Sequence, residues 1–300
     1  MNNQTIQEST NAAPSAFKTA LSSANLKVAG LDDFGRDNYG GWDIIVFKLI
    51  MLKTVAERMD RAKELGQKIY VDIDDFFEGL SDTNLAYKNT DPNRNDEVNR
   101  EHYYEIIQKA DGVITSTPFL RDYYIEQGIK NVFMVRNGID IDRWHRRRDH
   151  ARYLPTVGWV GATPWRSRDL ETMQPFFGEW MEKTRLPFHH AGYIKNAMQA
   201  TDQLGLPSIT KITHEPRKPI LEYPEMFRKM DIGLVPLNNI PFNHAKSTIK
   251  GLEYTAAGIP FIASYSPEYE LLEQQGVGRV ARTPEEWIHH LSELQDPKNR

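Results

Sequence analysis

The stretch from residue 245 to 264, AKSTIKGLEYTAAGIPFIAS, places a carboxylate and several phosphate-binding groups on one expected helix. Lys246, Ser247 and Thr248 stand at the helix start, where free backbone N–H groups and the helix dipole attract phosphate oxygens. Glu253 follows about two turns later. The spacing suits a nucleotide diphosphate. An ordinary capped helix with a solvated Glu253 fits the same residues.

A second group of charged side chains follows an apolar run. Asp72, Asp74 and Asp75 come at the end of the expected strand Lys68 to Ile73. The Asp-x-Asp spacing offers hard oxygen ligands, which Mg²⁺ and Mn²⁺ prefer. Asp74 or Asp75 could instead bind and orient an acceptor hydroxyl at the carboxyl end of a strand. Solvation and helix capping form the third interpretation, and we assign no metal.

Three further groups of residues are open to both functional and structural interpretations. The loop from 33 to 41 combines glycines with Arg36, Asn38 and Tyr39, and it suits either an acceptor-side loop or a surface connection. A basic cluster could contact nucleic-acid phosphate, but the acidic residues interleaved with it favour a solvated hinge; it comprises Arg143, Arg146, Arg147, Arg148 and Arg152. Four histidines lack metal-ligand spacing and are expected to be structural or solvated: His102, His189, His190 and His214.

The elements that must position these groups are short β-rich runs alternating with longer helical ones. This alternation is typical of parallel sheets covered by helices on both faces. Strands are expected at 26–30, 43–48, 68–73, 112–116, 131–135, 156–160, 187–191, 208–212, 231–235 and 260–263. One helix is expected to end near residue 66, and another to run through Leu170, Met173, Phe177 and Trp180. The other expected helices span 96–110, 118–127, 222–229, 247–257, 267–274 and 284–294. Within 247–257, Ser247 is the expected N-cap and Gly258 the stop.

The alternation restarts after Asn137 and Gly138, which indicates two domains. At 300 residues the chain is long enough for two separate cores. We expect a flexible arm at 1–22, an N-terminal Rossmann-like domain with the linker at 23–150, and a C-terminal Rossmann-like domain at 151–300. Ligands of such sheets bind beyond the carboxyl ends of the strands, so a cleft is expected between the facing loops.

Composition narrows the class of protein. The chain has 37 Lys plus Arg against 41 Asp plus Glu, which is not the positive charge of a dedicated nucleic-acid binder. It has no cysteine, which excludes disulfides, thiol nucleophiles and thiolate metal sites. No signal-peptide core and no apolar run of membrane-spanning length is found, so a cytoplasmic protein without a membrane span is expected.

Three segments, in this order and spacing, together carry a family resemblance. They are ADGVITSTPFLRDYYIEQGIKNVFMVRNGIDIDRW at 110–144, VGWVGATPWRSRDLE at 157–171, and DIGLVPLNNIPFNHAKSTIKGLEYTAAGIPFIAS at 231–264. Over residues 40 to 297 the chain resembles the GT-B fold glycosyltransferases, especially the retaining family 4 type. The resemblance implies two Rossmann-like domains, a nucleotide-diphosphate sugar as donor, retention of anomeric configuration, and no required metal or other cofactor.

The resemblance also assigns roles to single residues. Glu253 matches the second of two glutamates eight positions apart and would hold the donor ribose, but Ala245 stands at the first position. The transferred sugar would then depend on neighbours, namely Asn243, His244 and Lys246. The N–H groups of Ser247, Thr248 and Ile249 would bind the diphosphate, and the glycine loop would contribute Gly161 and Ala162.

Relatives carry an Arg and a Lys about five residues apart after the first strand of the second domain. This chain has Arg166 and Arg168 there and no Lys at that spacing. Arg166 is the choice for neutralising the leaving diphosphate, and Lys246 would supply the missing ammonium. Asp74 and Asp75 complete the catalytic residues on the acceptor side.

The sequence indicates the class of the donor and several classes of acceptor. The donor is expected to be a UDP- or GDP-sugar with a hexosyl group, and the acceptor a protein, a modified DNA base, another nucleic acid or a glycan. Two other classes of protein fit the same residues. One is a nucleotide-sugar isomerase or hydrolase on this fold. The other is a non-catalytic nucleotide-sugar or nucleic-acid binding protein, which Ala245 makes conceivable.

Overall fold

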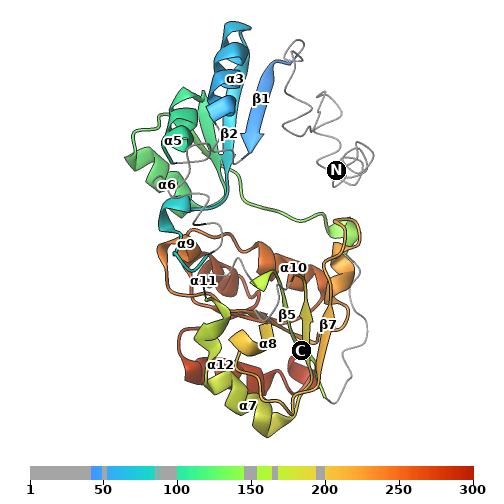
Figure 1. Cartoon of the computed structure of the whole chain (residues 1–300). Helices are drawn as coiled ribbons and strands as arrows, with labels where there is room; N and C mark the ends of the chain where they lie inside the picture. The colour runs from blue at the N-terminus through green and yellow to red at the C-terminus, as the bar shows by residue number, and fades with distance from the viewer. Residues whose placement is uncertain are drawn as a thin grey trace.

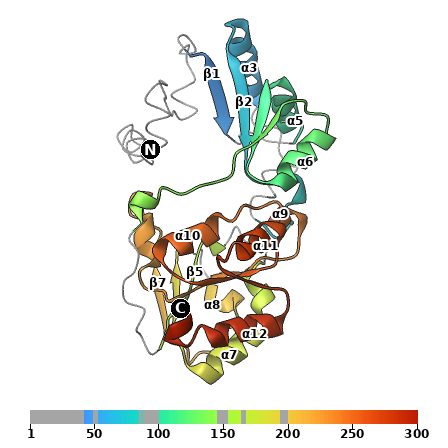
Figure 2. The same cartoon turned by 180° about the vertical axis from the view of Figure 1, so that it is seen from behind.

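The computed structural model describes residues 42–48, 53–84, 87, 100–144, 154–163, 168–193 and 200–300. These residues form two parallel sheets, each with its own helices (Figure 1). We call residues 42–135 the N-terminal unit, 136–144 the linker, and 154–300 the C-terminal unit. Figure 2 shows the linker crossing from one unit to the other as an extended segment. No helix among the described residues has both the length and the apolar character needed to cross a membrane.

The N-terminal unit contains a four-stranded sheet in the order β1-β2-β3-β4, and all its pairs are parallel. Its strands are β1 (Ile44–Lys48), β2 (Lys68–Ile73), β3 (Gly112–Thr115) and β4 (Val132–Met134). Its helices are α3 (Lys53–Glu64), the 3₁₀ helix η1 (Phe77–Gly79), α5 (Arg100–Lys109) and α6 (Pro118–Glu126). Each described strand therefore pairs with its nearest neighbours in the sequence.

The core of the N-terminal unit lies on one face of its sheet. Alternate strand residues, including Ile45, Ile69 and Val113, pack against buried side chains of α3, α5 and α6. On the opposite face Ile44 and Val46 are more than half exposed. Among the described residues, helices therefore cover a single face of this sheet.

The C-terminal unit contains a six-stranded parallel sheet in the order β10-β9-β8-β5-β6-β7. Its strands are β5 (Val157–Val160), β6 (Phe188–Ala191), β7 (Ile212–Glu215), β8 (Ile232–Val235), β9 (Phe261–Ser264) and β10 (Arg279–Ala281). The order reverses between β5 and β8, as in a doubly wound Rossmann sheet. That reversal defines the crevice in which ligands of such sheets bind.

Two separate cores cover the two faces of the C-terminal sheet. One core joins the sheet to η4 (Leu170–Met173), α7 (Phe176–Thr184), α8 (Ala200–Gln203) and α12 (Pro284–Glu293). The other joins it to η5 (Tyr223–Phe227), α10 (Ile249–Ala257) and α11 (Pro267–Gln274). The remaining short helices are η2 (Ile141–Arg143), α9 (Pro241–His244) and η6 (Pro297–Asn299). This unit is buried on both sides, as the sequence predicts.

Most expected elements are present, and a few differ for local reasons. The strand expected at 208–212 is wrong by several residues, because the exposed segment Ile212–Glu215 is the one that pairs with β6. Pro175 divides the helix expected through Leu170 and Trp180 into η4 and α7. The strand at 26–30, the arm at 1–22 and the boundary at 150 lie outside the described residues.

Candidate functional site

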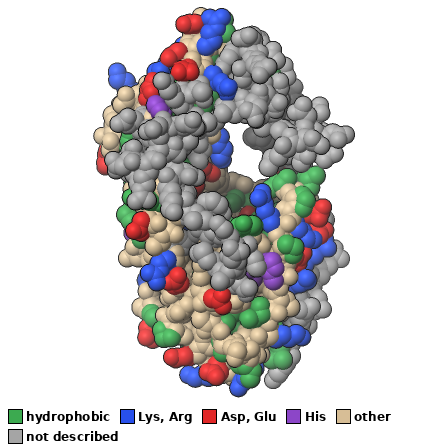
Figure 3. Space-filling view, in the orientation of Figure 1, with side chains coloured by type: hydrophobic (Ala, Val, Ile, Leu, Met, Phe, Trp, Pro, Cys, Tyr) green, Lys and Arg blue, Asp and Glu red, His purple; other side chains and the backbone are tan. Residues whose placement is uncertain are grey.

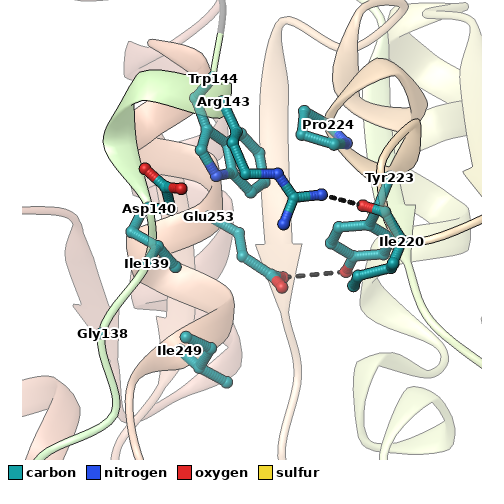
Figure 4. A pocket seen from close by; sticks show the side chains of 10 residues that line it. All are labelled: Gly138, Ile139, Asp140, Arg143, Trp144, Ile220, Tyr223, Pro224, Ile249 and Glu253. Carbon is teal, nitrogen blue, oxygen red and sulfur yellow. Dashed lines mark hydrogen bonds between the residues drawn. The ribbon is translucent and has the colours of Figure 1, made fainter. Parts of the chain in front are cut away.

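A cavity of about 310 Å³ lies where the linker meets the C-terminal unit (Figure 4). One wall is the linker, and the other comes from η5 with the residues before it and from the start of α10. The lining residues are Gly138, Ile139, Asp140, Arg143, Trp144, Ile220, Tyr223, Pro224, Ile249 and Glu253. Two of the residues predicted from the sequence, Ile249 and Glu253, therefore face one cavity.

Glu253 is held by a cation and a phenol on the cavity wall. Its side chain is 13% exposed, and its Oε2 accepts from Lys250 Nζ at 2.7 Å and from Tyr223 Oη at 3.0 Å. Lys250 Nζ also donates to Tyr223 Oη at 3.0 Å. Burial raises the pKa of Tyr223, which keeps the phenol protonated as a donor. The other oxygen, Oε1, has no hydrogen-bond partner among the described residues and can accept from a ligand.

The linker wall is fixed by contacts of its own. Arg143 donates to the carbonyl oxygen of Ile220 across the cavity. Trp144 packs edge-on against Tyr223, with ring centroids 6.3 Å apart. Both carboxylate oxygens of Asp140 are buried, and within the described ranges neither has a hydrogen-bond partner. The cavity thus combines aromatic surface with carboxylates and an arginine.

The start of α10 differs from the expected N-cap. The helix begins at Ile249, and Thr248 rather than Ser247 is the N-cap residue. The prediction for Ser247 is wrong because its Oγ is bonded by Asn137 Nδ2 of the linker, at 2.9 Å. Within the described part of the chain, the backbone N–H groups of Ser247, Thr248 and Ile249 have no acceptor. They remain available to an anion at the positive end of the helix.

Lys246 and Ala245 lie just before this helix at the contact between the two units. The Lys246 Nζ lies 4.5 Å from the centre of the Phe242 ring. Ala245 is 1% exposed and belongs to the core cluster of the N-terminal unit. Its carbonyl oxygen accepts from Thr117 Oγ1 at 2.9 Å. The residue in place of the family glutamate is therefore an apolar contact between the units.

Gly161, Ala162 and Asn243 lie near the reversal point of the C-terminal sheet. Gly161 follows β5, and its N–H donates to the carbonyl of Ala191 at 2.9 Å. A Cβ on Gly192 would come within 2.0 Å of the Gly161 carbonyl oxygen, so this turn requires glycine. Asn243 is buried, and its amide donates to Asp169 at 2.6 Å. None of the three lines the cavity around Glu253.

The predicted acceptor-side carboxylates follow β2 and do not line the cavity. Lys48 Nζ lies 3.2 Å from a carboxylate oxygen of Asp74 and 3.5 Å from one of Asp72. Lys48 thus forms ion pairs with both carboxylates. Asp75 also follows β2, and Arg166 lies outside the described residues.

The histidines split into a buried pair and a surface group. Burial lowers the pKa of His189 and of His190 to about 4, so both are neutral at pH 7. In the part of the chain that the structure describes, one group of side chains is close enough to hold a metal: His289, His290 and Glu293 on α12. Arg279 already bonds Glu293.

Sequence reasoning missed Tyr223, Lys250 and Asp140. Lys250 stands three residues before Glu253 on α10, so helical spacing alone could have identified their contact. Tyr223 comes from a distant element and gives no such signal. On the face of the molecule in Figure 3, basic and acidic side chains of the C-terminal unit are interspersed rather than gathered into one basic patch.

Comparison with known proteins supports the fold. No protein-family model matches the sequence, and no curated protein matches it. Among solved structures, Anabaena HepE in complex with UDP and glucose aligns with a TM-score of 0.57 and 14% identity, over 86% of this chain and 70% of HepE. A UDP-forming trehalose-phosphate synthase from Burkholderia xenovorans aligns at 0.55 and 16%, over 86% of this chain and 67% of the synthase.

A third neighbour is S. aureus TarM in complex with UDP, with a TM-score of 0.53 and 14% identity. The alignment covers 80% of this chain, which spans 47% of the TarM chain. These neighbours are GT-B glycosyltransferases, so the chain has the GT-B fold that its sequence resembles.

Proposed function

We propose that this protein is a glycosyltransferase that takes a sugar from a nucleotide-diphosphate donor, with UDP as the first nucleotide to test. The observation that carries the proposal is the cavity beside α10, into which Glu253 presents an oxygen that has no hydrogen-bond partner among the described residues. A volume of about 310 Å³ lies in the range of small-molecule sites. The fold, and the UDP found in complexes of TarM and HepE, support the same class of ligand.

The donor is proposed to lie along α10. Its ribose hydroxyls donate to Glu253 Oε1 in the cavity, beside the aromatic rings of Trp144 and Tyr223. Its diphosphate accepts from the N–H groups of Ser247, Thr248 and Ile249, where the helix dipole is positive. Gly161 and Ala162 complete the donor loop, and Asn243 lies toward the sugar.

The reaction breaks the bond between the anomeric carbon and the diphosphate oxygen, and the bonding electrons stay with the diphosphate. Lys246 and Arg166 are proposed to neutralise the charge that develops on this leaving group. The acceptor hydroxyl forms the new bond to the same carbon, and its proton is released. Retention of configuration, a hexosyl group and a reaction without metal are parts of the proposal that rest on the resemblance.

The acceptor is proposed to bind against the N-terminal unit, near the carboxyl end of β2. Asp74 and Asp75 follow that strand and carry hydrogen-bond acceptors for its hydroxyl. We place the boundary between this acceptor-side domain and the donor-binding domain at residue 150. Protein, nucleic acid and glycan acceptors are the classes to test.

The deciding experiment measures binding and turnover with a panel of UDP- and GDP-sugars. Calorimetry should show binding of UDP or GDP. Release of the nucleoside diphosphate from the nucleotide sugar should rise when a cell extract supplies the acceptor. If the nucleoside diphosphate is released equally fast with and without the extract, the protein is a hydrolase. If the sugar of the nucleotide sugar is converted into another sugar, the protein is an isomerase. Firm nucleotide binding without any turnover would identify a binding protein. Binding of neither nucleotide would overturn the proposal.

A further inference from the structure

The burial of Ala245 raises the question of which side chain holds the transferred sugar. Position 245 faces the core of the N-terminal unit, with Phe242 as its neighbour in the same cluster. A carboxylate there would be desolvated among apolar side chains. Recognition of the sugar by a carboxylate therefore requires a residue from another element.

Asp169 is a buried carboxylate near the same crevice. It follows the loop after β5 and is 1% exposed. Its Oδ1 accepts from the backbone N–H of Asn238 at 2.9 Å and from the Asn243 amide at 2.6 Å. Asn238 comes from the loop after β8, and its carbonyl also accepts from the Asn243 amide at 2.9 Å. These contacts fix Asp169 between the loops that follow β5 and β8.

The carboxylate of Asp169 is only half satisfied. Its Oδ2 is buried without a hydrogen-bond partner among the residues that the structure describes, and so is Oδ1 of Asn243. Among the described residues no cation pairs with Asp169, and the adjacent Arg168 pairs with Glu171. A buried polar atom without a partner is costly and is uncommon outside functional sites. The two atoms are acceptors, so the missing group is a hydrogen-bond donor.

The location indicates what that donor belongs to. β5 and β8 are the neighbours between which the strand order of the sheet reverses, and their carboxyl ends flank the ligand crevice. A phosphate would be repelled by a carboxylate, whereas a sugar hydroxyl is a neutral donor that two neighbouring acceptors can orient. The chemistry therefore fits the hydroxyl-bearing part of the donor.

We propose that Asp169 binds a hydroxyl group of the transferred sugar through Oδ2, with Asn243 as its fixed neighbour, and thereby sets the sugar preference of the protein. This role for Asp169 rests on the proposed function, because it requires a sugar-bearing donor in the crevice. Asp169 would thus take the sugar-binding role of the carboxylate that is missing at residue 245. The nucleotide part of the donor makes no contact with it.

The test separates affinity for the sugar from affinity for the nucleotide. Calorimetry on the wild type is done with UDP, GDP and their glucose, galactose, N-acetylglucosamine and mannose derivatives. It identifies the nucleotide sugar that binds most tightly and gives the ratio of its affinity to that of the free nucleotide. Asp169→Asn should lower affinity for that nucleotide sugar about tenfold or more, and leave affinity for the free nucleotide within about twofold. Glu171→Gln, a neighbouring carboxylate on the surface, should change neither.

Deoxy analogues of the preferred donor identify the contact itself. One analogue should bind the wild type about tenfold more weakly than its parent, and the Asp169→Asn variant should no longer distinguish the two. Asn243→Ala, which leaves the Asn238 N–H on Asp169, provides a second variant and should show the same loss in weaker form. Unchanged affinities, or an equal loss for nucleotide and nucleotide sugar, would overturn this inference alone. A wild type that binds no nucleotide would overturn the proposed function as well.

Discussion

The two sheets of this protein follow the same alternation of strands and helices, but within the described residues helices cover a different number of faces in each. In the C-terminal unit, separate cores cover both faces of the sheet. In the N-terminal unit, the described helices cover one face, while Ile44, Val46 and Phe133 are 57%, 53% and 49% exposed. The difference lies in the order of the strands rather than in their composition.

Strand order decides burial because parallel crossovers are right-handed. Strands added in one direction, as in β1-β2-β3-β4, carry their connecting helices to one face. The reversal between β5 and β8 sends later helices to the other face and opens a crevice at the same point. In the C-terminal unit, full burial and the proposed donor site therefore have one cause.

The largest expected effect tests the difference in burial directly. Phe188→Ala removes a fully buried ring from the C-terminal sheet and should lower the free energy of unfolding by about 3–5 kcal/mol. Phe133→Ala, on the open face of the N-terminal sheet, should cost about 1 kcal/mol or less. Urea denaturation followed by circular dichroism measures both. Equal losses would show that the second face of the N-terminal sheet is buried in solution.

The second prediction separates the two units by function. Glu253→Gln removes a charged acceptor and should weaken nucleotide binding by about 1.5–3 kcal/mol, or roughly 10- to 100-fold. Asp74→Asn should leave nucleotide affinity unchanged and reduce transfer to the acceptor. Calorimetry and diphosphate release measure the two quantities. If Asp74→Asn weakened nucleotide binding instead, the assignment of donor and acceptor sides would be wrong.

The third prediction concerns pH and the C-terminal sheet. His189 and His190 have a folded-state pKa of about 4, below the value near 6.5 of an exposed histidine. Because the folded protein favours the neutral rings, their contribution is complete above pH 6.5. It is lost as the pH falls from 6.5 toward 4, at no more than about 1.4 kcal/mol per pH unit for each histidine.

Denaturation midpoints at pH 7.5, 6.5 and 5.5 test this dependence. Replacing both buried histidines with glutamine should reduce the slope between pH 6.5 and 5.5. A slope that survives the double replacement would assign the pH dependence to other groups.

The smallest expected effect concerns the contact between the linker and the C-terminal unit. Asn137→Ala removes the hydrogen bond to Ser247 Oγ and should cost about 1 kcal/mol of stability. A double-mutant cycle with Ser247→Ala should give a coupling energy of about 0.5–1.5 kcal/mol. Additive single effects would mean that this bond contributes nothing in solution.

Local sequence signals predicted much of the fold. The apolar alternation in Lys68–Ile73 and the Ser-Pro start of Pro267–Gln274 specify their elements without tertiary information. Gly258 adopts the left-handed conformation expected at a helix C-cap. The errors occur where distant contacts decide. The pairing of β7 with β6 and the bond from Asn137 to Ser247 cannot be read from neighbouring residues.

The residues of the candidate site likewise fall into those that local sequence predicts and those that depend on distant contacts. Helical order along α10 was enough to place Ile249 and Glu253 on one side of the helix. The cavity itself depends on Tyr223 and the linker, which approach from other parts of the chain. Asp169 was passed over because its buried, unsatisfied oxygen is a property of packing and has no sequence pattern.

The segment 240–245 follows β8 of the C-terminal unit, yet its apolar side chains Ile240, Phe242 and Ala245 pack in the core of the N-terminal unit. Phe242 is 6% exposed there, and a Cβ on Gly79 would come within 2.6 Å of its backbone nitrogen. Turning one unit away from the other about the linker must withdraw this ring into water, at about 1.5–3 kcal/mol. Burial of Phe242 in the core of the other unit therefore favours the arrangement in which the two units stay in contact.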